Sequence, residues 1–474
     1  MEKSVPFPSK SQRIKQAIKK RCQIKPPVTS DPRLFHPRAK SGIIACIALV
    51  ATAGGFSSTI YFPGLPYITR DLNATPIATT LTAALFILFS GIAPVVWASL
   101  SEYYHLRRFI YLVAMVIFMV TSVAAACINN IWALVAVRCI QSIGVSSGMA
   151  VGAGYISDLY PIEERGAAFG KFIFGVVFGP LLGPILGGFL IMSAAGWRAT
   201  FWFCFAFGAL IFCVTFLFLP ETFREPTWDK PEELPLHGVR VEEEEEGKKK
   251  LFNPFAAFEL LKHPFILLSS VSTGFFFGAM FATETILPNA FKNKYGLNSW
   301  QVGLSYLGAG IGNLSGSMLG GRLSDRLLLA ARARRGEGAP HVAEDRLTMN
   351  LWFAGFLFNP LGLLIFGWVV ERELSFWGAI VAFGVQCFGN VQFVTTVTAY
   401  LVDAVPGRGA AVTAVANFVR FTFACILTLI STPMTEGLGA GWTSTLFACL
   451  SWLGISIMLV LKIWGHRMRA WSGF

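Results

Sequence analysis

Three ionisable side chains lie inside long apolar runs of this sequence, namely Arg138, Glu284 and Arg420. A charged group at the centre of a membrane segment costs about 2.5–3.5 kcal/mol on insertion scales, so it usually faces a cavity and has a function. A buried carboxylate such as Glu284 can bind and release a proton, and an arginine can hold an anionic group. These residues predict a polar site within a membrane domain, with Glu284 as the proton carrier.

Amide and aromatic side chains accompany these charges at helical spacing. Residues three or four positions apart share one face of an α-helix, as Arg138 and Gln141 do. The same reasoning adds a set of residues to the site: Gln141, Phe277, Gln386, Asn390 and Asn417. We expect all of these side chains to line one central pathway for substrate and protons. The alternative for the arginines and amides is a tie between two helices, and the alternative for Phe277 is packing or lipid contact.

A second group of polar residues marks the ends of apolar runs and recurs about half a chain apart. The segment from Asp158 to Arg165, followed by Gly-Ala-Ala, is echoed by the segment from Asp403 to Arg408, also followed by Gly-Ala-Ala. An acid followed by bases precedes each copy: Glu102, Arg107 and Arg108 in one, Asp325 and Arg326 in the other. Ion pairs Asp158–Arg165 and Asp403–Arg408 are expected to form in one conformation and break in another.

The elements that would position these residues are membrane-spanning helices. Of 474 residues, 54% are hydrophobic and 14% are charged, a composition that indicates lipid as the solvent. The apolar residues form runs of roughly 20, the length at which a helix crosses a bilayer. Twelve spans are predicted, at residues 42–67, 77–100, 107–128, 131–155, 166–192, 197–220, 265–289, 300–320, 348–370, 376–402, 409–433 and 442–463.

The repeated motif divides these spans into two halves. The expected fold is an all-α membrane protein with twelve transmembrane helices in two pseudo-symmetric six-helix bundles, each built from inverted three-helix repeats. The expected organisation is a basic tail at 1–41, an N-terminal bundle at 42–220, a central loop at 221–264, a C-terminal bundle at 265–465 and a tail at 466–474.

Basic residues are distributed unequally between the two sides of the expected membrane domain. Of the 39 Lys and Arg residues, 32 fall on the side of the two termini, five on the other side and two within spans. Because basic loops stay in the cytoplasm, both termini and the central loop are predicted to be cytoplasmic. The chain is expected to be a multi-pass membrane protein, in the plasma membrane rather than an internal one.

Charge and residue pattern also exclude several functions. The net charge of +12 is concentrated in the first 41 residues, which hold 11 Lys or Arg, and a basic tail before a span is a topology signal near anionic lipid. The sequence has no nucleophile–base pair, metal-ligand cluster or phosphate-binding loop, and its six histidines lie outside the cores of the spans. We therefore expect no enzyme activity, metal, cofactor or nucleic-acid partner.

Glycine and proline in the fifth run predict a packing seam that can flex. Gly179, Gly183 and Gly187 are four apart, so they share one helix face and permit close approach of a neighbouring helix. Pro184 removes a backbone donor and favours bending, and Gly188 extends the stretch. These five residues are the expected hinge.

This glycine stretch also carries a family resemblance. Its pattern G-x-x-x-G-P-x-x-G-G at residues 179–188 matches the antiporter signature of major facilitator exporters. Arg138-x-x-Gln141-Ser-x-Gly144 is similar to the fourth-span signature of that group, and residues 57–66 resemble the first span of its fungal members. Over roughly 42–465 the chain therefore resembles the fungal twelve-spanner drug:proton antiporters.

The resemblance implies the major facilitator fold, proton coupling through Arg138 and gating by the loop after the second span. In that loop Glu102 keeps the family's acid, and Arg107 and Arg108 keep its bases, but both glycines and the first arginine of the family pattern are absent.

Together these observations predict proton-coupled efflux of a small organic molecule such as a drug, a secondary metabolite or an organic anion. Two cavity arginines against one acid favour an anionic substrate. The alternative is an exporter or facilitator of small di- or tricarboxylic acids, and a more distant one is a non-transporting receptor. The expected partners are the substrate, protons and the lipid bilayer, and the expected state is a monomer.

Overall fold

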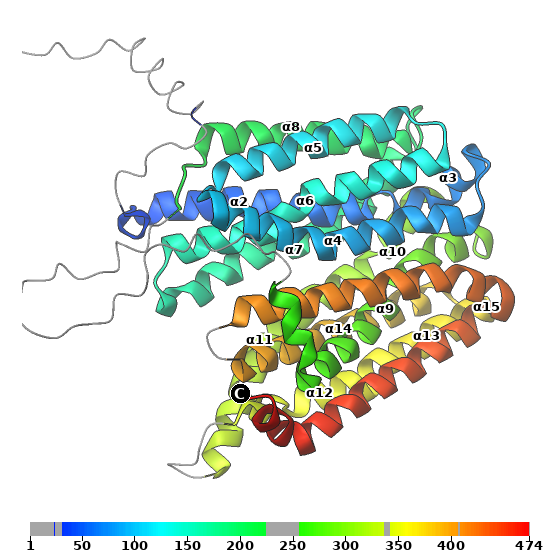
Figure 1. The fold of residues 1–474 in the computed structure, drawn as a ribbon. Coiled ribbons are helices and arrows are strands. Elements are labelled where there is room, and N and C mark those ends of the chain that lie inside the picture. The colour runs from blue at the N-terminus through cyan, green and yellow to red at the C-terminus, as the bar shows by residue number, and fades with distance from the viewer. Residues whose placement is uncertain (1–22, 24–30, 224–255, 336–341, 406–407, 474) are drawn as a thin grey trace, which may run out of the picture.

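The structure is a computed structural model that describes residue 23 and residues 31–223, 256–335, 342–405 and 408–473. In these residues every regular element is a helix and none is a strand, which confirms the all-α fold class. The long uninterrupted helices lie side by side in Figure 1 and are α4 (Pro76–Tyr104), α5 (Arg108–Cys127), α6 (Ile131–Leu159), α7 (Ile162–Leu190), α8 (Arg198–Phe218), α9 (Pro264–Asn293) and α14 (Phe376–Ala404).

The remaining spans contain breaks. The first consists of α2 (Pro37–Thr59), a 3₁₀ turn and α3 (Leu65–Asp71). The eighth consists of α10 (Ser299–Ser305) and α11 (Leu307–Arg335). The ninth consists of α12 (Met349–Phe353), a π-helical turn at Ala354–Phe358 and α13 (Asn359–Glu371). The structure has helical elements at each of the twelve predicted spans.

The last two spans form one element, α15 (Gly409–Trp471), which reverses direction at Gly439. That residue has φ +85° and ψ 166°, outside the helical region. In the described residues, ten helices are long and apolar enough to cross a membrane, with α15 counted once and α11 outside the set.

Proline explains the interruptions in the first and ninth spans. Pro63 lies in the 3₁₀ turn Phe62–Gly64, and Pro66 occupies the first turn of α3. Pro360 is the second residue after the π-helical turn, and its nitrogen cannot donate to the preceding turn of helix. These breaks lie within the membrane segments and bend them locally.

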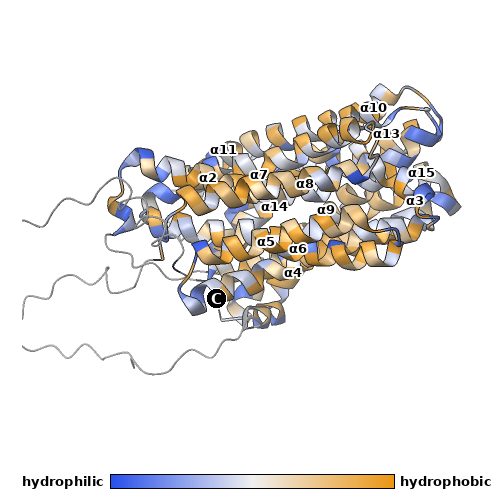
Figure 2. Cartoon of the chain, turned by 90° about the horizontal axis from the view of Figure 1, so that it is seen from above, coloured by the Kyte–Doolittle hydropathy of each residue, from blue (hydrophilic) through white to orange (hydrophobic). Residues whose placement is uncertain are grey.

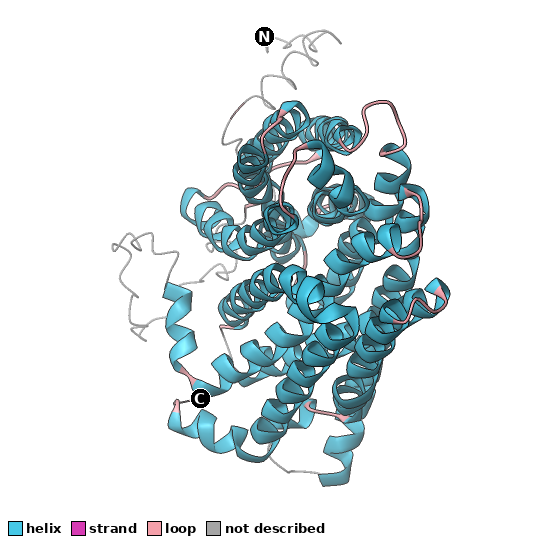
Figure 3. Cartoon of the chain, turned by 90° about the vertical axis from the view of Figure 1, so that its right-hand side faces the viewer, coloured by secondary structure: helices cyan, strands magenta, loops and turns pink. Residues whose placement is uncertain are grey.

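The helices divide into two groups, α2–α8 and α9–α15, which occupy the upper and lower parts of Figure 1. Figure 3, in which the right-hand side of Figure 1 faces the viewer, shows the helices and the loops that join them at that end. The two groups meet where α4 packs on α15 and where α7 packs on α10 and α11. We call the end at which α2 begins and α15 finishes the terminal end. The opposite end holds α3 and the turn at Gly439. Hydrophobic residues, orange in Figure 2, occupy the middle of the bundle, and hydrophilic residues, blue, gather at both ends.

The buried cores show where the two halves join. One cluster contains residues of both halves near the opposite end, such as Tyr61 and Leu65 together with Phe291 and Tyr306. Two other clusters each belong to a single half and extend to the terminal end: one includes Ile43, Ile110 and Leu159, and the other includes Phe265, Leu401 and Leu461. The halves thus share a core at the opposite end and have separate cores toward the terminal end.

Candidate functional site

Arg138 lies in α6 with only 1% of its surface exposed. One amino group of its guanidinium donates to the main-chain oxygen of Ser57 (3.0 Å) and to Gln141 Oε1 (2.7 Å). The guanidinium lies over the rings of Tyr61 and Phe86, 4.1 and 4.0 Å from their centroids. Hydrogen bonds and aromatic faces therefore stabilise this cation, a role that a carboxylate would have in an ion pair.

The surroundings of Arg138 belong to the N-terminal half. Gln141 Nε2 donates to Ser122 Oγ of α5 (2.9 Å), which ties α6 to its neighbour. Within the described residues, Nε and Nη2 of Arg138 have no hydrogen-bond partner. A buried donor without a partner costs about 1–3 kcal/mol, so these two atoms are available to a ligand, a water or a rearranged side chain.

Glu284 lies in α9, in the half that does not contain Arg138, and is 5% exposed. The Tyr306 hydroxyl donates to its main-chain oxygen (2.6 Å), and the Cys387 thiol is within electrostatic reach of its carboxylate. Its Oε2 has no hydrogen-bond partner among the described residues. A carboxylate without a compensating cation is stable in such a place mainly as the neutral acid.

Two amides of α14 accompany Glu284. Gln386 is fully buried, and neither atom of its amide has a partner in the described residues. Asn390 is 2% exposed, and its Nδ2 donates to Met280 Sδ of α9 (3.1 Å). Asn390 therefore lies against the helix that carries Glu284, and Gln386 lies one turn away from Asn390 in α14.

Arg420, in α15, is the third charge predicted from the sequence. It donates to Asn417 Oδ1 in a short hydrogen bond and lies 4.9 Å from the centroid of the Phe277 ring. Phe277 also makes edge contacts with Phe281 and Phe421. The predicted pathway residues thus fall into an N-terminal group around Arg138 and a C-terminal group around Glu284 and Arg420.

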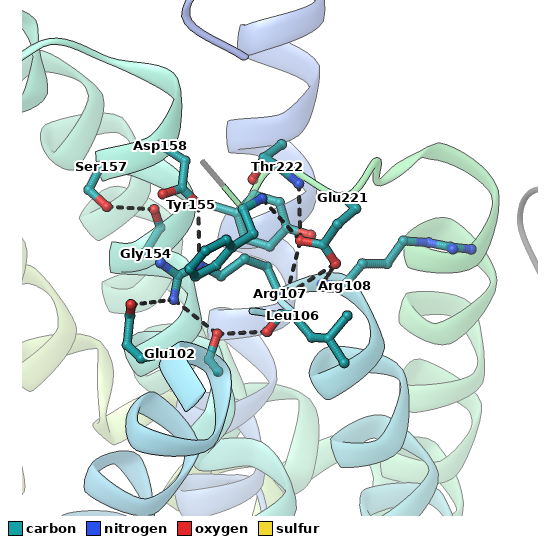
Figure 4. Close-up of polar contacts among 12 residues, drawn as sticks. Glu102, Leu106, Arg107, Arg108, Gly154, Tyr155, Ser157, Asp158, Glu221 and Thr222 are labelled. Atoms are coloured by element: carbon teal, nitrogen blue, oxygen red, sulfur yellow. Dashed lines mark hydrogen bonds and ion pairs between the residues drawn. The ribbon is translucent and has the colours of Figure 1, made fainter. Parts of the chain in front are cut away.

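A further cluster at the terminal end, drawn in Figure 4, centres on Arg107. The Arg107 guanidinium pairs with Asp158 at the end of α6 (3.1 Å) and with Glu102 at the end of α4 (2.7 Å). The carboxylate of Glu221, just after α8, accepts the backbone N–H groups of Arg107 and Arg108 at the start of α5, both at 3.0 Å. An acid at a helix N-terminus satisfies donors that the helix cannot. This cluster joins the ends of α4, α5, α6 and α8.

Comparison with known proteins identifies the family of this chain. The sequence model of the Major Facilitator Superfamily matches residues 47–429, most of the chain. The chain belongs to the major facilitator superfamily. It is therefore a transporter of small molecules and a multi-pass membrane protein, not an enzyme.

Individual relatives agree with this family. The MFS transporter fsa7 of Fusarium sp. is 31% identical over 444 residues, covering 90% of this chain and 84% of that one. The MFS antiporter QDR3 of Candida albicans is 27% identical, covering 94% of this chain and 80% of that one. Among solved structures, a D-xylose–proton symporter has a TM-score of 0.64 at 17% identity, covering 88% of this chain and 97% of that one, and so supports the fold.

In this major facilitator protein, the aspartates of the repeated motif pair with arginines other than the expected ones. Asp158 pairs with Arg107, whereas Arg165 donates to the main-chain oxygens of Tyr160 and Ser157, both at 3.0 Å. Arg165 thus satisfies carbonyls at the C-terminus of α6. The expected Asp158–Arg165 pair is therefore not formed in this conformation.

In the second copy of the motif, too, the aspartate pairs with an arginine other than the expected one. Asp403 pairs with Arg346 at 2.9 Å, and Arg408 is exposed. Arg346 was not predicted, although its position just before the ninth span matches that of Arg107 before the third. Arg326 is exposed in α11, and the side chain of Asp325 lies outside the described part of the structure.

The expected hinge glycines lie at two helix interfaces. A Cβ on Gly179 would stand 2.6 Å from the Thr52 oxygen of α2, and side chains on Gly183 and Gly187 would collide with Thr59 and Ile60. Gly188 faces the other half, where a Cβ would stand 2.5 Å from the Ser299 oxygen. Pro184 also faces that half, because its oxygen lies 2.5 Å from a Cβ built on Gly303. The stretch therefore contacts α2 on one side and α10 on the other.

Proposed function

We propose that this protein exports a small organic molecule in exchange for protons. The observation that carries the proposal is Glu284, a buried carboxylate with a free Oε2 in a helix that packs at the junction of the two halves. Protonation of this group removes a charge from a site that has no compensating cation. The proton therefore changes which conformation of the transporter is favoured.

The arrangement of the halves supports an alternating cycle. They share a core at the opposite end and have separate cores toward the terminal end. With both termini in the cytoplasm, as the basic residues indicate, this conformation is closed to the outside. The substrate and the proton would bias the same two-state equilibrium in opposite directions, which is the requirement for exchange.

One relative supports exchange as the mode of coupling. The matched Candida albicans protein is named an antiporter. We place the protein in the plasma membrane as a monomer. Labelling of single cysteines by an impermeant reagent on intact cells should reach position 294 and miss position 245, and labelling at 245 would reverse the orientation.

Efflux from proteoliposomes tests the function directly. The purified chain should move substrate from a panel of drugs, organic acids and amines faster when a pH difference is imposed. Glu284→Gln resembles the protonated state and cannot release a proton, so any efflux that it retains should not respond to the pH difference. If the wild type moves no compound in the panel, the transport proposal fails. If Glu284→Gln keeps the wild-type pH profile, another residue carries the proton.

A second candidate is export of small di- or tricarboxylic acids. The specific observation in its favour is the set of guanidinium donors without partners in the described residues, Nε and Nη2 of Arg138 and Nε of Arg420. Guanidinium groups bind carboxylates through paired hydrogen bonds. In the same assay, uptake of dicarboxylates but not of neutral or cationic compounds would favour this candidate.

A further inference from the structure

The C-terminal half holds a group of buried polar atoms that the described fold leaves without partners. Four atoms of three side chains are involved: Glu284 Oε2, Gln386 Oε1, Gln386 Nε2 and Asn390 Oδ1. These side chains belong to residues that are 5%, 0% and 2% exposed. Each unpartnered buried atom costs about 1–3 kcal/mol, so a native structure rarely keeps several together without a ligand, water or ion to satisfy them.

The register of α9 against α14 places these side chains at a similar level along the two helices. The helices run in opposite directions, and the contact between Met280 Sδ and Asn390 Nδ2 (3.1 Å) aligns them. Residues four positions apart share a helix face, so one turn onward in α9 comes Glu284 and one turn back in α14 comes Gln386. The electrostatic contact between Glu284 and Cys387 agrees with this alignment.

The free atoms have a definite chemical character. Three are acceptor oxygens and one is an amide N–H donor, because the nitrogen of Asn390 is already bound to Met280. The titratable groups beside Glu284 are Tyr306 and Cys387, both neutral acids. The cation of this half, Arg420 of α15, lies against Phe277, seven positions before Glu284 in α9, and makes no ion pair with Glu284 in the described residues. A site with three acceptors, one of them a carboxylate, fits a group that brings three donors and a positive charge.

We propose that Glu284, Gln386 and Asn390 form a subsite for a primary ammonium group of the transported molecule. Such a group has three N–H donors, one for each free oxygen. The inference rests on the proposed transport function and names a substrate class for it, an amine with an apolar body. Phe277 and Phe281, whose rings meet at 4.9 Å on the same helix, supply apolar surface beside the subsite.

Proton exchange follows from the same contacts. The ammonium binds best when Glu284 is ionised, so its binding releases the proton that Glu284 held, and proton return releases the amine. An anion would face three acceptor oxygens, one of them from the carboxylate, so it is not expected here. This part of the site therefore selects against the carboxylic acids that the arginines alone would suggest.

Three probes of similar shape test the subsite on the full-length purified protein. Phenethylamine has the primary ammonium, N-acetylphenethylamine has one N–H and no charge, and 3-phenylpropanoate is an anion. Equilibrium dialysis with radiolabelled phenethylamine should show saturable binding, competed neither by the acetylated amide nor by the anion. Gln386→Leu and Asn390→Leu should each weaken binding about tenfold, the usual effect of losing one hydrogen bond to a charged group.

Gln392→Leu is the matched control, because Gln392 is also a buried amide of α14 but contacts Asn350 instead. It should bind phenethylamine as the wild type does. Gln386→Leu should unfold at or above the wild-type temperature, since the amide it replaces has no partner in the described residues. Equal binding by wild type, Gln386→Leu and Asn390→Leu would overturn the subsite. So would absence of amine binding in a protein that still exports another compound against a pH difference, a result that leaves the transport proposal intact.

Discussion

Lys292 Nζ of α9 lies 3.4 Å from the centroid of the Tyr67 ring in α3, so a cation of the C-terminal half rests on an aromatic ring of the N-terminal half. The contact is at the opposite end, where the halves share a core. Nearby on the same interface, the hydroxyls of Thr80 and Thr432 meet at 2.7 Å. These contacts must break if this end opens.

Replacement of Tyr67 by leucine should therefore favour opening. A cation–π contact contributes about 0.5–2 kcal/mol, which corresponds to a shift of roughly 2- to 30-fold between two states. In a variant without the native cysteines, a cysteine at position 80 should react faster with an impermeant reagent when Tyr67 is leucine. Trp368→Leu is the control, because Arg372 rests on Trp368 within one half. Equal rates in the Tyr67 and Trp368 variants would rule out this role.

Arg138 should be required for proton-driven transport but not for folding. It has no acidic partner in the described residues, and an apolar replacement for a buried charge is often neutral for stability. Arg138→Met should therefore unfold near the wild-type temperature while losing uphill efflux. Arg138→Lys should retain part of the activity, since a point charge cannot reproduce a planar fork between two rings. Normal pH-driven efflux by Arg138→Met would make Arg138 a structural tie.

The glycines of α7 allow a graded test of the seam. Leucine at Gly183 would collide with Thr59 of α2, and leucine at Gly187 with Ile60, the residue after α2. A Cβ at Gly170 of α7 meets nothing within 4 Å. We expect Gly183→Leu and Gly187→Leu to reach the membrane yet lose most efflux, and Gly170→Leu to behave as the wild type. Efflux normalised to protein in the membrane is the measurement. Full activity in both seam variants would remove the hinge role.

The arginines at the terminal end should differ in their effect on stability. The Arg107–Asp158 side chains are 5% and 8% exposed, and the Arg346–Asp403 side chains are 19% and 34% exposed. Loss of one partner of a buried pair costs about 3–5 kcal/mol, and an exposed pair contributes about 0–1 kcal/mol. Thermal unfolding should show Arg107→Gln as the most destabilised, Arg346→Gln as intermediate and exposed Arg408→Gln as near wild type. The reverse order would contradict the assigned pairs.

Much of the fold could be predicted because membrane helices have a length fixed by the bilayer. Apolar runs such as 107–128 and 197–220 need no knowledge of their neighbours to be recognised as spans. The repeat also drew attention to an acid near the end of α6 and of α14, and both Asp158 and Asp403 are paired, although with arginines other than the expected ones. These are features that local sequence determines.

The partners of those residues could not be predicted, because partners depend on packing between distant segments. Arg107 is 51 positions from Asp158 in sequence and Arg346 is 57 from Asp403, whereas the nearer Arg165 is used at a helix end. The rings around Arg138 come from two other spans, Tyr61 from the break after α2 and Phe86 from α4. Glu221 was assigned to the central loop, and only the fold shows that it satisfies the start of α5.

The turn at Gly439 has a consequence for inherited variation. Its backbone angles, φ +85° and ψ 166°, lie in a region that only glycine occupies readily, and a Cβ there would stand 2.7 Å from Glu371 Oε1. A base change at either of the first two positions of a glycine codon replaces the residue, and every replacement carries a Cβ. Missense changes at codon 439 should therefore be rare among isolates, whereas silent changes at its third position accumulate freely.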